Sequence, residues 1–174
     1  AWGMPAANIT ELNWWDEVRL DSLTLALTPT RHFSGRGFTD RFNTLWGSWV
    51  IQGTKRNLYF SGDSGYFPGF KEIGDKYGPF DLTFMECGAY NEAWREIHMF
   101  PEESAQAHLD VKGRLMMPIH WGKFDLSLHD WTESVNRLRA KADAENIQLV
   151  TPEIGQLVLI PDEVIFEDWW KEYE

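Results

Sequence analysis

Residues 80–122 read FDLTFMECGAYNEAWREIHMFPEESAQAHLDVKGRLMMPIHWG. The stretch opens with the mostly apolar run Phe80 to Glu86, which predicts a strand. After an irregular segment, Pro101 suits the first position of a helix, and acidic residues follow it in the first turn. That helix should stop at Gly113, and the run 114–119 predicts a second strand. Strands separated by helices indicate a partly parallel sheet with at least one helical layer.

The flanking sequence extends this sheet. Alternating polar and apolar residues predict a half-buried strand over 22–27, and a run rich in Trp and β-branched residues predicts another over 45–52. The length of the chain predicts one α/β domain over residues 1–174. The other predicted elements are a hairpin strand at 57–61, a glycine-rich loop at 62–69, helices at 70–77 and 129–145, and closing strands at 148–151 and 156–160.

Charge and composition narrow the possible partners and compartments. The chain has 16 basic and 27 acidic side chains, a formal net charge of −11. Because this charge repels phosphate backbones, we expect no nucleic-acid partner. The single cysteine, Cys87, excludes an internal disulfide and suits a reducing compartment. No apolar run approaches the roughly 18 residues of a membrane span. We expect a cytoplasmic chain, with peripheral membrane contact as an open alternative.

Three apolar runs each lead to a residue that can bind a metal ion. These residues are His32, Asp63 and His120. In open α/β sheets, ligands gather in the crevice outside the carboxyl ends of the strands, so residues that are distant in sequence can converge there. Two imidazoles and a carboxylate suit zinc or a similar divalent ion, which lowers the pKa of bound water to near 7. The set therefore predicts metal-dependent hydrolysis.

Each of these three residues also has an ordinary structural explanation. His32 lies in a predicted loop, where a histidine is commonly a surface or hydrogen-bonding residue. Asp63 lies among glycines, where an aspartate often shapes a turn. His120 follows an apolar strand, where one hydrogen bond can satisfy a buried histidine. The coincidence of three strand-end positions favours the metal site.

The remaining histidines and one glutamate need separate interpretations. His98 lies in the irregular segment before Pro101, where it can donate a proton to a leaving group or contact a substrate phosphate. Packing at the start of the helix is the alternative for His98. His108 and His129 fall in predicted helices, and we expect them to face solvent. Glu86 ends a strand and could line the same crevice as the metal site.

Seven strings between Leu23 and Phe124, with their order and spacing, resemble the C-terminal half of the metallo-β-lactamase superfamily hydrolases. The branch they resemble most is the N-acyl-phosphatidylethanolamine-hydrolysing phospholipase D. The resemblance implies half of an αββα sandwich, a mixed sheet with helices on its outer face. The strings are TPTRHFSGR, TLWGSWVI, FSGDSGY, IGDKYGPFDL, GAY, HMFPEESAQAHLD and MMPIHWGKF.

The same resemblance implies a phosphodiesterase site with two zinc ions. His32 would bind one ion, Asp63 would bridge both, and His120 would bind the second. A bridging hydroxide would attack phosphorus, and His98 would act on the substrate or the leaving group. Asp63 and His98 are thus the implied catalytic residues. The implied substrate is an N-acyl-phosphatidylethanolamine-like phospholipid or a small organophosphate.

One departure from the family is large. The motif H-x-H-x-D-H, which supplies the main metal ligands, is absent from the 174 residues. Each zinc ion would keep one histidine and the shared Asp63, fewer than the three protein ligands usual for catalytic zinc. The chain begins at Ala1 rather than Met, which fits a fragment. We therefore predict an inactive chain that associates, through the exposed inner face of its sheet, with the missing N-terminal half or with itself.

Two other functions remain open from the sequence. A lactonase or another hydrolase of the superfamily is possible because loops and the missing half set the substrate class. A non-catalytic interaction module that keeps the fold without the chemistry is the second alternative.

Overall fold

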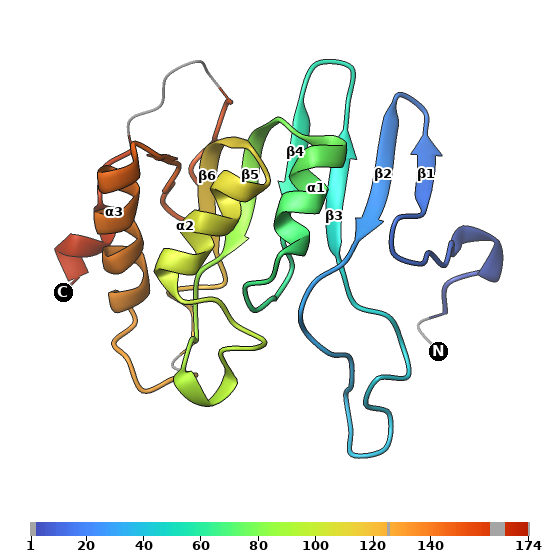
Figure 1. The fold of residues 1–174 in the computed structure, drawn as a ribbon, viewed down its shortest axis with the longest axis horizontal. Helices are drawn as coiled ribbons and strands as arrows, with labels where there is room; N and C mark the ends of the chain where they lie inside the picture. Colours follow the sequence, from blue (N-terminus) through green and yellow to red (C-terminus); the bar gives the residue numbers. More distant parts are fainter. Residues whose placement is uncertain (1–2, 125, 161–165, 174) are drawn as a thin grey trace.

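A single mixed sheet forms the centre of the computed structural model, which describes residues 3–124, 126–160 and 166–173. Across these residues the sheet has seven strands, in the same order in space as in sequence (Figure 1). The first four strands pair antiparallel, and β4 to β7 pair parallel. The strands are β1 (Glu17–Leu20), β2 (Leu23–Thr28), β3 (Ser48–Gln52), β4 (Asn57–Phe60), β5 (Phe80–Glu86), β6 (Gly113–Ile119) and β7 (Gln148–Leu149).

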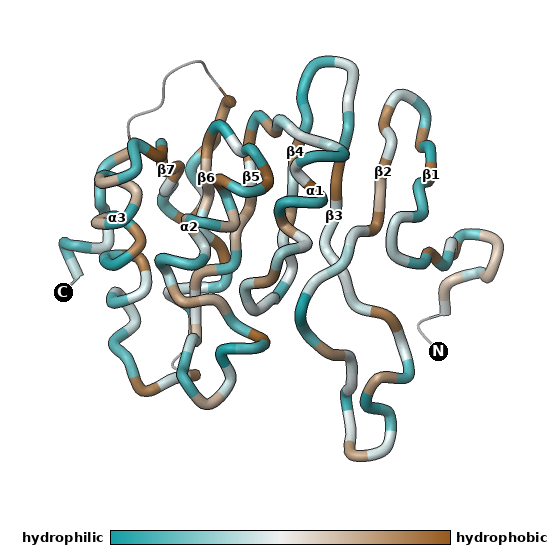
Figure 2. The backbone as a smooth tube through the Cα atoms, in the orientation of Figure 1, coloured by the Kyte–Doolittle hydropathy of each residue, from teal (hydrophilic) through white to brown (hydrophobic). Residues whose placement is uncertain are grey.

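The α-helices of the described chain cover one face of the sheet (Figure 1). They are α1 (Gly69–Tyr77), α2 (Pro101–Asp110) and α3 (Glu133–Glu145), with short 3-10 turns at Ala6–Asn8, Glu92–Trp94 and Trp169–Tyr173. Figure 2 shows hydrophilic residues interrupted by apolar ones along these helices, as expected for helices with one face in the core. Within the part of the chain that the structure describes, none of the helices has the length and apolar character that crossing a membrane requires.

The main hydrophobic core lies between the sheet and these helices. Phe70 and Ile73 of α1 are fully buried and belong to one cluster with Tyr59 of β4 and Phe80 of β5. The Tyr59 and Phe80 rings lie 5.4 Å apart between centroids. Burying such aromatic side chains supplies much of the free energy that stabilises a core of this size. This core fixes the strands whose ends carry the predicted metal ligands.

A second, smaller apolar cluster lies on the opposite face of the sheet. Leu82, Leu115 and Val150 are buried there, and Val158 and Ile160 pack against them. Next to this cluster is a groove of about 670 Å³ with mainly apolar lining. The helices leave this face free, and the segment after β7 covers only part of it.

The predicted fold class, an α/β mixed sheet with helices on one face, is confirmed. The strand over 80–86 matches β5 residue for residue, and the helix predicted from Pro101 is α2, which ends at Asp110. The hairpin predicted between 45–52 and 57–61 is the antiparallel pair β3–β4. Hydrophobic periodicity was sufficient for these elements because their apolar faces are buried in the main core.

Three elements differ from the sequence prediction. β1 was not expected; it is an edge strand with little burial and therefore a weak apolar pattern. α3 begins at Glu133 rather than 129, because the preceding residues fold back on Tyr90, where Ser127 Oγ donates to the Tyr90 carbonyl oxygen. The strand predicted at 156–160 is wrong: this segment joins no sheet in the described structure, and its apolar residues lie over the second cluster instead.

Two histidines are also placed differently from the prediction that they face solvent. His108 of α2 is 1% exposed, and its Nδ1 lies 2.7 Å from Thr83 Oγ1. His129 lies outside α3, is half-buried and stacks on Tyr90 at 4.2 Å between ring centroids. Burial lowers the pKa of His108 to about 4, so the neutral imidazole is the form that fits the core.

The buried His108 predicts a pH-dependent stability. The unfolded chain binds a proton on this residue below about pH 6.5, whereas the folded chain resists it down to about pH 4. The stability that neutral His108 contributes to the fold is therefore fully present above pH 6.5 and is lost as pH falls towards 4. Urea unfolding should show the free energy of unfolding falling about 2 kcal/mol more between pH 7.5 and pH 5 in the natural chain than in His108→Gln. Equal losses in both proteins would contradict the assignment.

Candidate metal centre

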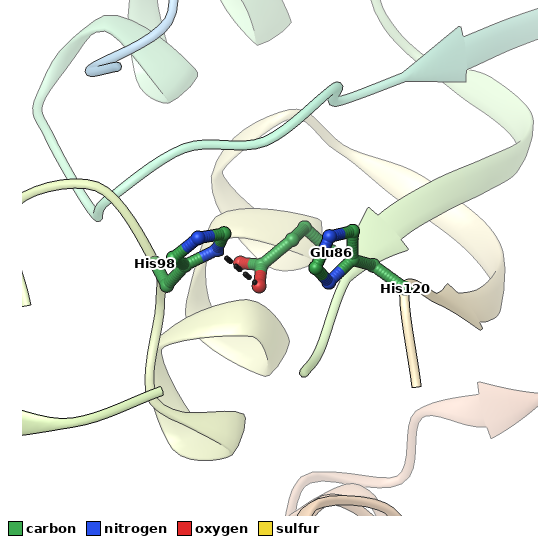
Figure 3. A group of neighbouring side chains, drawn as sticks. All are labelled: Glu86, His98 and His120. Atoms are coloured by element: carbon green, nitrogen blue, oxygen red, sulfur yellow. Dashed lines mark hydrogen bonds and ion pairs between the residues drawn. The ribbon is translucent and has the colours of Figure 1, made fainter. Parts of the chain in front are cut away.

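Parallel pairing places three strand ends at one edge of the sheet. Asp63 lies three residues after β4, Glu86 is the last residue of β5, and His120 directly follows β6. Because β4, β5 and β6 run in the same direction, these residues emerge side by side. Figure 3 shows Glu86, His98 and His120 gathered at this edge, and their candidate ligand atoms all lie within 4.8 Å of one another.

The loop that carries His32 is tied to the loop that carries Asp63. The Arg31 N–H donates to Ser64 Oγ at 3.0 Å, and the Gly65 N–H donates to the Arg31 carbonyl oxygen at 2.9 Å. β2 and β4 both pair antiparallel with β3, so β2 runs in the same direction as β4 and ends at the same edge of the sheet. The bonds hold the His32 loop against the Asp63 loop at that edge. Gly65 is required here, because a Cβ at this position would lie 2.3 Å from the Glu96 carbonyl oxygen.

The structure brings the four predicted site residues together. His120 Nε2 lies 3.7 Å from Asp63 Oδ2. The His98 ring lies between the other two histidines, with centroids 5.6 Å from His32 and 5.3 Å from His120. The Asp63 and His120 side chains are partly exposed, so this edge is open to a ligand.

His120 has a backbone conformation that L-residues seldom adopt. Its φ is +64°, in the left-handed region, which costs on the order of 1 kcal/mol for a residue other than glycine. Gly88 allows the neighbouring chain to approach, because a Cβ there would lie 1.7 Å from the His120 carbonyl oxygen. Backbone strain held in place by close packing is typical of functional sites. The positive φ of His120 turns the chain sharply at the end of β6, next to Asp63.

Glu86 is the main residue whose role the sequence left undefined. Its side chain is fully buried and lies 3.1 Å from His98 Nδ1. Burial raises the pKa of Glu86, while the bonds to His98 and to backbone N–H groups oppose that rise. Burial alone would lower the pKa of His98, but the Glu86 and Asp63 carboxylates outweigh it and raise that pKa. A carboxyl group at a strand end was visible in the sequence, but its pairing with a loop residue was not.

The available donor atoms fit a divalent metal ion. The Nδ1 of His32 donates to the Phe33 carbonyl oxygen at 2.9 Å, which leaves Nε2 as the ring nitrogen with a free lone pair. The His120–Asp63 separation of 3.7 Å is too long for a hydrogen bond but suits two ligands of one ion at about 2.0–2.2 Å each. His32, Asp63 and His120 stay the predicted ligands, whereas the described residues whose ligand atoms all lie within 4.8 Å of one another are Glu86, His98 and His120. Glu86 is less suited, because both of its oxygens already accept backbone N–H groups.

Comparison with known families assigns the chain to a class. Residues 2–121 match the model of the family described as "Beta-lactamase superfamily domain". The chain belongs to this family.

Individual relatives agree with the family and with the resemblance found in the sequence. An uncharacterized protein of Mycobacterium tuberculosis is 45% identical over 174 residues, which are 98% of this chain and 46% of that protein. The N-acyl-phosphatidylethanolamine-hydrolyzing phospholipase D 1 of Caenorhabditis elegans is 32% identical over 86% of this chain and 45% of its own length. The chain thus spans about half the length of these relatives.

A solved structure shares the fold. Igni18, a metallo hydrolase from the archaeon Ignicoccus hospitalis, superposes with a TM-score of 0.65 at 22% identity, over 84% of this chain and 58% of that one. At this identity the likeness concerns the fold alone. Together with the family match, it agrees with the predicted metallo-β-lactamase type of sheet.

Zinc titration tests the ligand set. We expect Asp63→Asn and His120→Gln each to weaken zinc binding by at least about tenfold, because each removes one donor from a small set. Isothermal titration calorimetry on the natural chain and on the variants measures this. His129→Gln is the matched control, since it removes a histidine that is not among the proposed ligands. Zinc affinity unchanged in both site variants would contradict the assignment.

Proposed function

We propose that this chain is the C-terminal half of a metal-dependent phosphodiesterase that hydrolyses N-acyl-phosphatidylethanolamine-like phospholipids or related organophosphates. The observation that carries the proposal is the convergence of His32, Asp63, His98 and His120 at one edge of the sheet. The similarity to a phospholipase D of that specificity supports the substrate class. The metal we propose is zinc, with two ions in the complete enzyme.

The residues of this chain have separate roles in the proposed reaction. A bound metal ion would lower the pKa of water and neutralise charge on a phosphate oxygen. His32, Asp63 and His120 would bind the ion and fix its position. His98, with its ring between the two histidines, faces the reacting group and moves a proton to or from it. His98 is 14% exposed, which limits the access of water to its ring.

The same proposal requires ligands from outside this sequence. Three protein ligands are usual for one catalytic zinc ion, and His32, Asp63 and His120 cannot complete two such sites. An N-terminal half that carries H-x-H-x-D-H would supply the missing donors. We propose that this half also covers the free face of the sheet, where a groove of about 670 Å³ has mainly apolar lining.

Hydrolysis is tested by combining the two halves. The chain should be expressed together with the segment encoded upstream of Ala1, and the release of phosphatidic acid from N-acyl-phosphatidylethanolamine measured. We expect activity in the combined protein, and a loss of more than about 100-fold in Asp63→Ala or His120→Ala, because the metal would be lost or displaced. His129→Ala should stay active.

Three outcomes count against this proposal. Turnover that survives both substitutions would refute the site. Faster cleavage of lactones than of phosphodiesters would favour the lactonase alternative. A combined protein that binds no metal and hydrolyses neither substrate would favour a non-catalytic interaction module.

Association through the free face is tested on the chain alone. Leu157 lines the groove and is 80% exposed, and Leu159 in the same segment is 73% exposed, which favours self-association when the other half is absent. Analytical ultracentrifugation should show dimers or larger species, shifted towards monomer by Leu157→Asp with Leu159→Asp. Leu109→Asp on α2 is the control, since Leu109 is 38% exposed on the helical side. A well-folded natural chain that stays monomeric at high concentration would contradict this prediction.

A further inference from the structure

Glu86 is a buried carboxylate with an unusually complete set of partners. Its side chain has 0% exposure at the end of β5. The Gly88 N–H donates to Oε1 at 3.2 Å, and the Met99 N–H donates to Oε2 at 3.0 Å. A buried carboxylate is destabilising unless its oxygens accept hydrogen bonds. These two backbone donors, with His98 as a third, therefore indicate a group that the fold holds in place.

The backbone of Glu86 is held as firmly as its side chain. Its N–H donates to Ser61 Oγ at 2.9 Å, and its carbonyl oxygen accepts from Ser104 Oγ at 2.6 Å. Ser61 follows β4, and Ser104 belongs to α2, so the residue is anchored to the sheet on one side and to a helix on the other. The carboxylate therefore has little freedom to move.

The third donor to Glu86 is His98, at 3.1 Å from Nδ1 to Oε1. Both Glu86 oxygens accept backbone N–H groups, and the ionised carboxylate has no proton to donate, so Nδ1 carries the proton in this contact. The other ring nitrogen, Nε2, is then the one with a free lone pair. The ring itself lies between His32 and His120, so this nitrogen belongs to the metal edge of the sheet.

We infer that Glu86 is a positioning residue that fixes the tautomer and the ring orientation of His98, so that Nε2 is available to the reacting group. This inference rests on the proposed function for its chemical purpose, because His98 has to meet the substrate or the leaving group. The pairing itself is a property of this chain and can be measured without turnover. Glu86 touches neither substrate nor metal in this account and acts only through His98.

The tautomer of His98 is measured by long-range ¹H–¹⁵N correlation NMR on the uniformly ¹⁵N-labelled chain at pH 7.5, with His98→Gln used to assign the signals. We expect separate signals for a protonated Nδ1 and an unprotonated Nε2. In Glu86→Gln the side-chain NH₂ has to face either a backbone N–H or His98 Nδ1, so the ring loses its preference for a proton on Nδ1. The Nδ1 and Nε2 signals of His98 should then average or exchange roles. Glu103→Gln is the control, since Glu103 lies near the same segment and binds the Phe100 N–H and Arg95 instead.

Either arm of the experiment can overturn the inference. A ring with the proton on Nε2 and none on Nδ1 in the natural chain refutes it without any variant, so the result stands even if Glu86→Gln fails to fold. Unchanged His98 signals in a folded Glu86→Gln chain also refute it, with the His108 signals serving as the check on folding. These outcomes leave the hydrolysis assay untouched, so failure of this inference and failure of the proposed function are distinguishable.

Discussion

The parallel pairing of β4, β5 and β6 is the constraint on which the rest of the structure depends. It brings the ends of three strands to one edge, and each end carries a polar residue: Asp63 after β4, Glu86 on β5 and His120 after β6. The helical layer buries apolar side chains of the same strands in the main core, so the edge is rigid. Rigid strand ends allow ligands to be held within the small tolerances that metal binding requires.

Two buried histidines of this fold have opposite environments. His108 is neutral in an apolar core, because burial without a carboxylate partner lowers its pKa. His98 is also largely buried, but the Glu86 carboxylate reverses the direction of the shift. The difference between their pKa shifts is the presence of acidic neighbours, Glu86 and Asp63, beside His98. The buried Glu86 carboxylate at the end of a central strand therefore favours the charged form of His98.

The sequence predicted the elements with strong periodicity and the residues at strand ends. The strand 80–86 and the helix from Pro101 needed only local pattern. The edge of the sheet that His32, Asp63 and His120 share needed only the common direction of the strands before them. The bond between Glu86 and His98 could not be predicted, because it depends on how the loop before α2 folds back. The prediction that His108 faces solvent was wrong for a similar reason. Packing of α2 against the sheet places His108 next to Thr83 in the core. The segment 156–160 has a strand pattern but no strand partner among the described residues.

We propose that His32, Asp63 and His120 form one half of a metal site at the carboxyl edge of the sheet. Anomalous diffraction at the zinc absorption edge, from crystals of the chain grown with zinc, tests it most directly. The account predicts an anomalous peak within bonding distance, about 2.0–2.2 Å, of at least His120 Nε2 and an Asp63 carboxylate oxygen. A peak bound instead by Glu86 and His98, with Asp63 and His32 uninvolved, would contradict it.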